Sequence, residues 1–418
     1  MVETVQKLKV DSGKLKVGRT DSGQPPQLLK DVSLKAVSRI STGISEFDRV
    51  LGGTASTREG EPTGGGGIVP GSVVLIAGDP GIGKSTLLLK AAANLNSLYI
   101  AGEESPQQIK LRFDRLKIKA PSLFITQETV IDRALEQASG SKHQLLVVDS
   151  IQTMETEDLD QAAGSISQVR ESAYRAHRYA KDSGTAVFIV GHVTKEGVVA
   201  GPRVLEHLVD TVLYLEGESE HEFRILRASK NRFGPVDEIG VFAMRDTGLV
   251  EVTNPSEQFL EERLVAPGSV VVSLLEGTRP LLTEIQALTT PTIFGAPKRV
   301  STGVDYNRLA LLVATLIKRA SLSLQNQDIF VNVAGGLRLF ERSADLGICL
   351  SIASAVLDKE VPKDTVAIGE VGLLGEIRTV PGLEKRIAEA RKLGFKRIIS
   401  PKEVKTLRQA ISLALKEN

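Results

Sequence analysis

Residues 78–86 read Gly78-Asp79-Pro80-Gly81-Ile82-Gly83-Lys84-Ser85-Thr86 and follow the pattern G-x-x-x-x-G-K-[ST]. An apolar run at 73–77 precedes this stretch, and a helical pattern at 87–93 follows it. In the order strand, loop and helix, backbone N–H groups of a glycine-rich turn and a helix N-terminus can surround a phosphate. The sequence therefore predicts that residues 78–86 form a P-loop, with ATP as the ligand.

The P-loop pattern assigns roles to three polar groups, two of which lie within it. Lys84 is expected to reach the β- and γ-phosphates, and the Ser85 hydroxyl to ligate Mg²⁺. Asp149 ends the apolar run 145–148, and it is expected to hold the same Mg²⁺ through water. The alternative for Asp149 is a carboxylate that begins an ordinary turn, and the presence of the P-loop favours the metal role.

Two other predicted strands also end in polar residues. Glu103 and Glu104 follow the strand at 97–100, which places one of them near the γ-phosphate as the base that activates water. The residues leave open which of the two it is, and their alternative role is favourable charge near the next helix N-terminus. His192 follows the strand at 186–190 and is either a γ-phosphate sensor or an ordinary hydrogen-bonded histidine.

A pair of cations ends a later strand. Lys230 and Arg232 are two residues apart, and side chains at that spacing on a strand point the same way. Such a pair can act on a neighbouring subunit's nucleotide as an arginine finger, and the alternative is a solvated strand end. The glycine-rich segment 191–203 is locally basic, which suits contacts to phosphate backbone as well as a plain surface loop.

Composition narrows the class of protein. Lys plus Arg (52) nearly balance Asp plus Glu (51) in the 418 residues, so any nucleic-acid surface must be a local patch. The single cysteine, Cys349, excludes a disulfide framework and a cysteine zinc site. No apolar run approaches about 18 residues and no signal-peptide pattern is present, so we expect a cytoplasmic protein with no membrane partner.

The chain divides into three parts by pattern. Residues 1–36 are polar and lack a sustained period, which indicates a flexible leader. In 37–265 apolar strands alternate with helices, which predicts an α/β domain with a mostly parallel sheet covered on both faces. After a seam near residue 266 the pattern of 266–418 indicates a separate α+β domain, with a helix at Tyr306–Ala320. Thr54–Gly67 looks like an inserted flexible loop.

With these motifs together, the chain resembles the bacterial RadA (Sms) recombination and repair ATPases, within the RecA/DnaB-like P-loop class. The resemblance covers most of 36–418, and its markers are the P-loop, Gly102–Ser105, Gly191–Gly197 and Lys230–Pro235. It implies a RecA-like ATPase core followed by a Lon-protease-like domain. It also implies a homohexameric ring that binds single-stranded DNA in its channel and acts as a helicase-type motor in branch migration of recombination intermediates.

The resemblance also assigns residues. Lys230 and Arg232 would act in trans, Lys195 and Arg203 would lie in or near DNA-facing loops, and a RecA-type recombinase is a further partner of interest. In Lon proteases a catalytic Ser is followed by a Lys after Gly-Leu. Here Ser343 is present but Glu384 takes the place of the Lys, so we expect no proteolysis and interpret Ser343 as a helix N-cap.

The chain departs from typical members of this family in two features, and two other functions stay open. Typical members begin with a four-cysteine zinc finger, which this chain lacks, and the insertion at Thr54–Gly67 is also unusual. The first alternative is an ATP-dependent Lon-like serine protease, which Ser343→Ala would inactivate. The second is a clock-type or signalling P-loop ATPase, whose slow hydrolysis would be indifferent to DNA.

Overall fold

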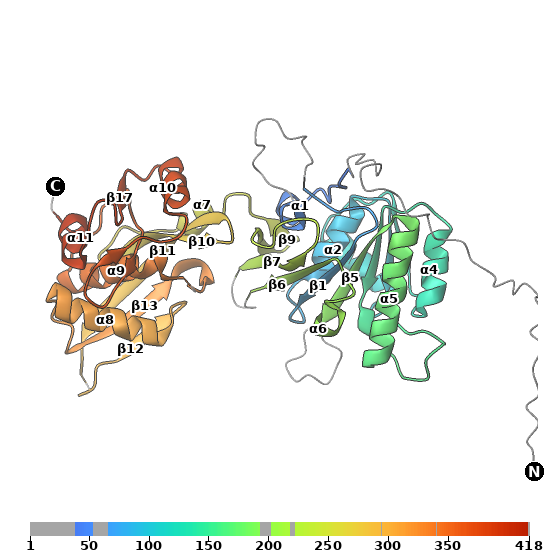
Figure 1. Cartoon of the computed structure of the whole chain (residues 1–418), viewed down its shortest axis with the longest axis horizontal. Helices are drawn as coiled ribbons and strands as arrows, with labels where there is room; N and C mark the ends of the chain where they lie inside the picture. The colour runs from blue at the N-terminus through green and yellow to red at the C-terminus, as the bar shows by residue number, and fades with distance from the viewer. Residues whose placement is uncertain are drawn as a thin grey trace, which may run out of the picture. The chain divides into compact units, whose positions relative to one another are not determined.

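The computed structural model of the chain describes residues 38–52, 66–192, 202–217, 222–293, 295–339 and 341–416. Within these ranges the chain forms a nine-stranded sheet, a six-stranded sheet and a two-stranded ribbon, all in the unit Ser38–Asn418 (Figure 1). None of the described helices is long and apolar enough to cross a bilayer. The leader at 1–36 and most of the insertion at Thr54–Gly67 lie outside the described residues.

Six parallel strands make up most of the nine-stranded sheet. In the order of the sheet, its strands are β3 (Leu123–Thr126), β2 (Ser97–Ala101), β4 (Leu145–Asp149), β5 (Ala186–His192), β1 (Val73–Gly78), β6 (Thr211–Glu216), β7 (Phe223–Asn231), β8 (Ile239–Arg245) and β9 (Gly248–Glu251). The strands from β3 to β6 pair in parallel, and β7, β8 and β9 continue the sheet as antiparallel strands.

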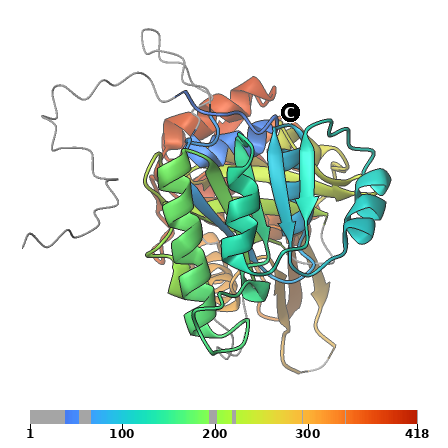
Figure 2. The same cartoon turned by 90° about the vertical axis from the view of Figure 1, so that its right-hand side faces the viewer.

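Helices cover both faces of the nine-stranded sheet. One buried cluster packs α1 (Ser45–Gly52), α2 (Lys84–Ala93) and α3 (Pro106–Arg115) against one face. The other packs α4 (Ile131–Ser139), α5 (Ile166–Ser183) and α6 (Pro202–Leu205) against the opposite face, where α4 and α5 lie side by side (Figure 2). Because both faces are covered, β1 is buried at every position. The predicted α/β class with a mostly parallel, RecA-like sheet is confirmed.

A second, smaller sheet follows the short helix α7 (Pro255–Leu260). In order, its strands are β12 (Arg299–Thr302), β13 (Gln327–Val333), β11 (Arg279–Pro291), β10 (Ser269–Glu276), β14 (Thr365–Ala367) and β17 (Arg397–Ile399), and the ribbon pairs β15 (Glu370–Val371) with β16 (Ile377–Arg378). Its helices are α8 (Tyr306–Ala320), α9 (Asp345–Leu357), α10 (Leu383–Lys392) and α11 (Leu407–Ala414). Short 3₁₀ turns are η2 (Ile151–Thr153), η3 (Ala334–Gly336) and η4 (Arg342–Ala344).

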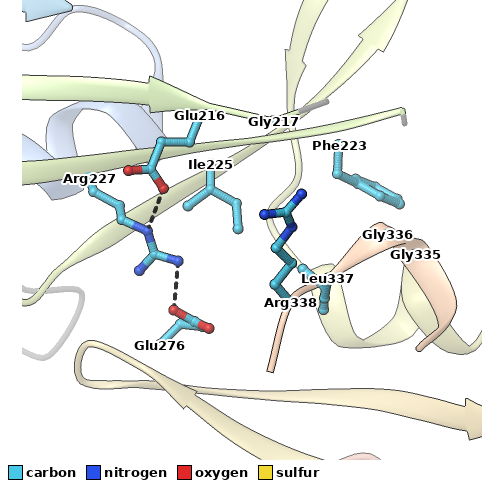
Figure 3. A pocket seen from close by; sticks show the side chains of 10 residues that line it. All are labelled: Glu216, Gly217, Phe223, Ile225, Arg227, Glu276, Gly335, Gly336, Leu337 and Arg338. Atoms are coloured by element: carbon cyan, nitrogen blue, oxygen red, sulfur yellow. Dashed lines mark hydrogen bonds and ion pairs between the residues drawn. The ribbon is translucent and has the colours of Figure 1, made fainter. Parts of the chain in front are cut away.

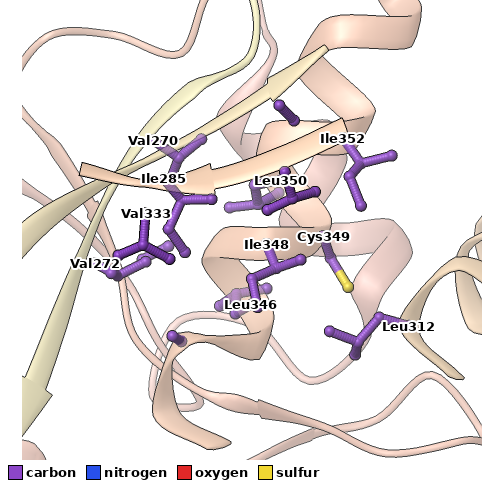
Figure 4. Close-up of a cluster of buried hydrophobic side chains, with 14 of the residues drawn as sticks. Val270, Val272, Ile285, Leu312, Val333, Leu346, Ile348, Cys349, Leu350 and Ile352 are labelled. Atoms are coloured by element: carbon purple, nitrogen blue, oxygen red, sulfur yellow. The ribbon is translucent and has the colours of Figure 1, made fainter. Parts of the chain in front are cut away.

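The apolar helix α9 occupies the middle of the second core. Figure 4 shows Ile348 and Cys349 of this helix among aliphatic side chains of the strands and of α8. Burial raises the pKa of the Cys349 thiol well above its usual range, so this thiol stays protonated and acts as a packing group. The same buried cluster includes Ile239 and Val241 of β8, so the apolar core continues from the end of the first sheet into the second.

Candidate active site

The carboxyl ends of four parallel strands bring the predicted site residues to one edge of the sheet. Ala101, the last residue of β2, pairs with Asp149 at the end of β4. Gly78, which ends β1, pairs with His192 at the end of β5. The loops after these strands therefore meet at the edge where open α/β sheets bind their ligands.

The P-loop joins β1 to α2 through glycines with positive φ. Gly81 has φ +77°, and a Cβ added there would meet nothing within 4 Å, so the loop faces open space. Gly83 has φ +114°, and a Cβ there would come within 2.8 Å of Leu249. No side chain of the described residues caps the N-terminus of α2, which starts at Lys84. The first N–H groups of α2 can therefore bind an anion.

The side chain of Lys84, the first residue of α2, folds back onto the start of this loop. Its Nζ donates hydrogen bonds to the carbonyl oxygens of Gly78 at 2.8 Å and Asp79 at 2.9 Å, and only 3% of the residue is exposed. Burial lowers the pKa of Lys84, while the carboxylates of Asp149, Asp79 and Glu103 act in the opposite direction. The ammonium therefore interacts with Asp149 and Glu103, two of the acidic groups that the sequence analysis assigns to the site.

A buried tyrosine orients the strand-end aspartate. The Tyr99 hydroxyl of β2 donates a hydrogen bond to the Asp149 carboxylate. Burial raises the pKa of Tyr99 well above its usual range, and the Asp149 carboxylate raises it further. The phenol therefore remains a donor at any physiological pH. The sequence analysis did not identify Tyr99, because an aromatic residue inside an apolar strand gives no signal of a polar role.

The two consecutive glutamates have different partners. The Ser150 hydroxyl donates to Glu103 Oε1 at 2.5 Å, and Glu103 is also one of the carboxylates that act on Lys84. Glu104 instead forms an ion pair with Arg112 of α3. Of the two, Glu103 is the one whose surroundings connect it to the P-loop lysine.

These groups line one cavity of about 390 Å³. Its walls come from the P-loop, from the ends of β2 and β4, and from one side of α3, and they comprise Pro80, Gly81, Gly83, Lys84, Ser85, Thr86, Tyr99, Ala101, Glu103, Glu104, Ile109, Arg112, Arg115 and Asp149. A hydroxyl from Ser85 and a carboxylate from Asp149 are the oxygen donors that Mg²⁺ prefers. The open glycine cradle and this donor set fit a nucleotide with its magnesium ion.

The Lys230–Pro235 motif lies at the other end of the parallel strands, where β1 and β6 begin. Lys230 and Asn231 pair with Val212 and Thr211 at the start of β6, and the adjoining Asp210 N–H donates to Val73 O, where β1 begins. Since β1 has six residues, about 17 Å of strand separates this end from the P-loop. The motif therefore cannot reach the nucleotide site of its own subunit.

The two cations of this motif differ in their surroundings. Lys230 Nζ donates to the carbonyl oxygens of Glu206 at 2.6 Å and Val209 at 2.7 Å, so it stabilises the turn after α6. The Arg232 side chain is 57% exposed, and one of its nitrogens lies 3.3 Å from the Asp210 carboxylate. Arg232 is therefore the better placed of the two to contact another molecule.

Three predicted residues fall at the limits of the described chain. His192 ends β5, and Arg203 lies in the short helix α6, but the side chains of both lie outside the described residues. Lys195 belongs to the segment 193–201, which is also outside them. The structure brings the backbone of His192 to the P-loop edge through its pairing with Gly78.

Ser343 has a different environment from the one predicted. It lies in η4, and the residue that precedes α9 is Ala344, which makes no side-chain cap. The N-cap interpretation is wrong because the buried Arg386 and the partly buried Glu341 hold the hydroxyl. Ser343 Oγ donates to Glu341 Oε1 at 2.7 Å and accepts from Arg386 Nη1 at 3.0 Å. Sequence analysis missed Arg386, which α10 directs inward, whereas the Glu384 side chain is 74% exposed.

The Arg386–Glu341 pair is expected to stabilise the second sheet. Arg386 is 0% exposed, and its guanidinium binds Glu341 at 2.5 Å, so Arg386→Met should lower the free energy of unfolding by about 3 kcal/mol. Arg342→Met is the matched control, because Arg342 is 66% exposed in its pair with Glu370 and should cost about 1 kcal/mol or less. Urea unfolding measures both, and equal losses would contradict the prediction.

A second cavity, of about 310 Å³, lies beside β7. Figure 3 shows Arg227 of β7 between two carboxylates, with bonds of 3.1 Å to Glu216 and 2.7 Å to Glu276 of β10. Phe223 and Leu337 contribute apolar walls. Arg227 has both carboxylates as partners, so the part of this cavity that the described residues line contains a salt-bridge network.

Comparison with known proteins decides the family. The chain is 51% identical to the DNA repair protein RadA of Listeria monocytogenes over 389 residues, which cover 91% of this chain and 82% of that protein. It is 52% identical to the DNA repair protein RadA of Bacillus subtilis, with coverage of 90% and 81%. The chain belongs to the RadA family. The RadA of Halalkalibacterium halodurans, at 50% identity, is covered over 86% of its length.

Two family models match parts of this RadA family member. The model described as the KaiC ATPase matches residues 40–144, which include the P-loop and both glutamates. The model described as subunit ChlI of Mg-chelatase matches residues 307–404, within the second sheet and its helices. Together with the P-loop geometry, these matches make the chain a nucleotide-binding P-loop ATPase of the RadA family with an additional α+β region.

Proposed function

We propose that this chain is an ATP-driven DNA motor of recombination and repair, which works as a homohexameric ring and promotes branch migration. The observation that carries the proposal is the position of Arg232. It is exposed and lies at the sheet edge opposite the P-loop of its own subunit. A role in hydrolysis therefore requires a neighbouring copy, which presents its own P-loop to this cation.

The proposed mechanism gives each group one task. Lys84 and the N–H groups of α2 bind the β- and γ-phosphates, and Glu103 takes the proton of the attacking water. Arg232 of the adjacent subunit balances the charge that develops on the transferred phosphoryl group. Mg²⁺, held by Ser85 and Asp149, would neutralise phosphate charge when bound.

The link between hydrolysis and DNA is proposed for the loop after β5. His192 ends the strand that pairs with β1, so a γ-phosphate sensor at this position would transmit the nucleotide state to Lys195 and Arg203. Those two cations would contact single-stranded DNA in the channel, by charge and without sequence preference. Branched recombination intermediates are the proposed substrate, and a RecA-type recombinase is the proposed partner.

The second sheet has a structural role in this proposal. We assign residues 37–265 to the ATPase domain and 266–418 to a Lon-like domain without protease activity. A guanidinium has hydrogen-bond donors and no acceptor, so Arg386 cannot act as the base for Ser343. Because Ser343 lies outside the nucleotide cavity, Ser343→Ala is expected to leave ATP hydrolysis intact. Protein cleavage that disappears in this variant would support the protease alternative.

The experiment that tests the proposal measures ATP hydrolysis with and without single-stranded DNA. We expect DNA to raise the rate of the whole chain and to bind more tightly when ATP is present. Lys84→Ala, which removes the P-loop cation, is the control for contaminating ATPases. Slow hydrolysis that ignores DNA would favour a signalling ATPase instead, and a particle mass of one subunit under every condition would contradict the ring.

A further inference from the structure

The ion pair between Glu104 and Arg112 is not used by the mechanism above. Both side chains line the nucleotide cavity, where they are 34% and 22% exposed. Glu104 directly follows Glu103, yet the two carboxylates bind different groups, Arg112 and the Ser150 hydroxyl. The pair therefore gives two adjacent and chemically identical side chains different surroundings.

Helix α3 fixes the direction from which Arg112 meets Glu104. Ser105 caps the helix in a reciprocal capping box with Gln108, and a proline occupies the first helical position. Ile109 is 2% exposed, and Arg112 lies three residues further on the same face of the helix. With its start capped and one face buried, α3 holds the guanidinium beside the cavity.

The cavity balances carboxylates against cations. Three carboxylates, those of Glu103, Glu104 and Asp149, line it together with Lys84, Arg112 and Arg115, and a bound nucleoside triphosphate adds negative charge. The Arg112 and Glu104 charges reach the Tyr99 hydroxyl, since Arg112 lowers the pKa of Tyr99 while Glu104 raises it. Tyr99 in turn donates to Asp149. An uncompensated charge on Glu104 would therefore act on the Asp149 carboxylate and on the phosphates.

We propose that Arg112 is a positioning residue, which holds Glu104 in an ion pair, cancels its charge and so leaves Glu103 as the carboxylate that acts on water. The inference rests on the proposed ATPase site and adds a selection between its two glutamates. The proposal predicts that substitutions of Arg112 and Glu104 have non-additive effects on the free energy of nucleotide binding. Loss of the arginine should harm nucleotide binding only while Glu104 is charged.

A double-mutant cycle tests this coupling in the whole chain. The variants are Arg112→Gln, Glu104→Gln and both together, and the probe is a fluorescent non-hydrolysable ATP analogue with Mg²⁺. Arg112→Gln is expected to raise the Kd of the analogue about tenfold, and the double variant to return within about threefold of the unmodified chain. Lys110→Gln is the matched control, because Lys110 lies on the same helix in an exposed pair with Asp114.

The outcomes separate the proposal from simpler explanations. Additive losses in the double variant, or an unchanged Kd in Arg112→Gln, would overturn it, and a lower melting temperature with unchanged Kd would show a purely structural pair. If Arg112→Gln does not fold, Arg112→Lys replaces it in the cycle, both alone and combined with Glu104→Gln. The analogue reports binding without DNA or hydrolysis, so failure of DNA to stimulate the ATPase would contradict the proposed function and leave this result standing.

Discussion

Arg232→Ala is expected to lower kcat for ATP hydrolysis in the assembled protein by about 10³–10⁵-fold while ATP binding is retained. The cation is needed where negative charge develops on the transferred phosphoryl group, and the bound nucleotide in the ground state needs it much less. Steady-state hydrolysis and analogue binding, measured on the same assembled sample, separate the two effects. Unchanged turnover would show that Arg232 is a solvated strand end.

A mixing experiment shows whether Arg232 acts between subunits. Arg232→Ala retains its own P-loop, and Lys84→Ala retains its own Arg232, so mixed assemblies contain interfaces where an intact P-loop meets an intact arginine. Two inactive preparations should then regain part of the activity. Arg178→Ala is the matched control, because Arg178 is 73% exposed on α5. Mixed particles of verified composition that stay inactive would contradict action in trans.

Glu103→Gln is expected to lower kcat by about 10²–10⁴-fold with little change in ATP affinity. The amide keeps the size of the side chain and its bond with Ser150 Oγ, but it cannot accept the proton of the attacking water. Single-turnover hydrolysis measures the chemical step directly. Glu104→Gln provides the comparison, and it should lose much less because Arg112 already occupies that carboxylate. A larger loss in Glu104→Gln would reverse the assignment.

Local signals made much of the fold predictable. The expected helix at Tyr306–Ala320 has those bounds in α8, because an aspartate cap and one apolar face specify it. The capping box of Ser105 and Gln108 at the start of α3 is a local feature of the same kind. The apolar runs before Gly78 and Asp149 form parallel strands, since strands buried on both faces consist of apolar residues at every position. These features depend on residues that are close in sequence.

The polar contacts of the site could not be predicted in the same way. Tyr99 and Asp149 are 50 residues apart, and Arg386 lies 43 residues after Ser343. Such pairs form only after the sheet and its helices are packed, and no periodic pattern records them. The N-cap interpretation of Ser343 failed because a local rule was applied where Arg386, from another helix, and the Glu341 carboxylate bind the hydroxyl. The choice between Glu103 and Glu104 likewise depended on Arg112.

Because Arg232 lies far from the P-loop of its own subunit, one defective subunit would affect more than one reaction centre in an assembly. If each reaction centre is divided between two copies, a subunit that lacks both groups inactivates its own centre and that of one neighbour. A minority of defective chains would then suppress a disproportionate share of the working particles. A gene carrying such a change would be expected to behave as dominant when it is expressed beside an intact one.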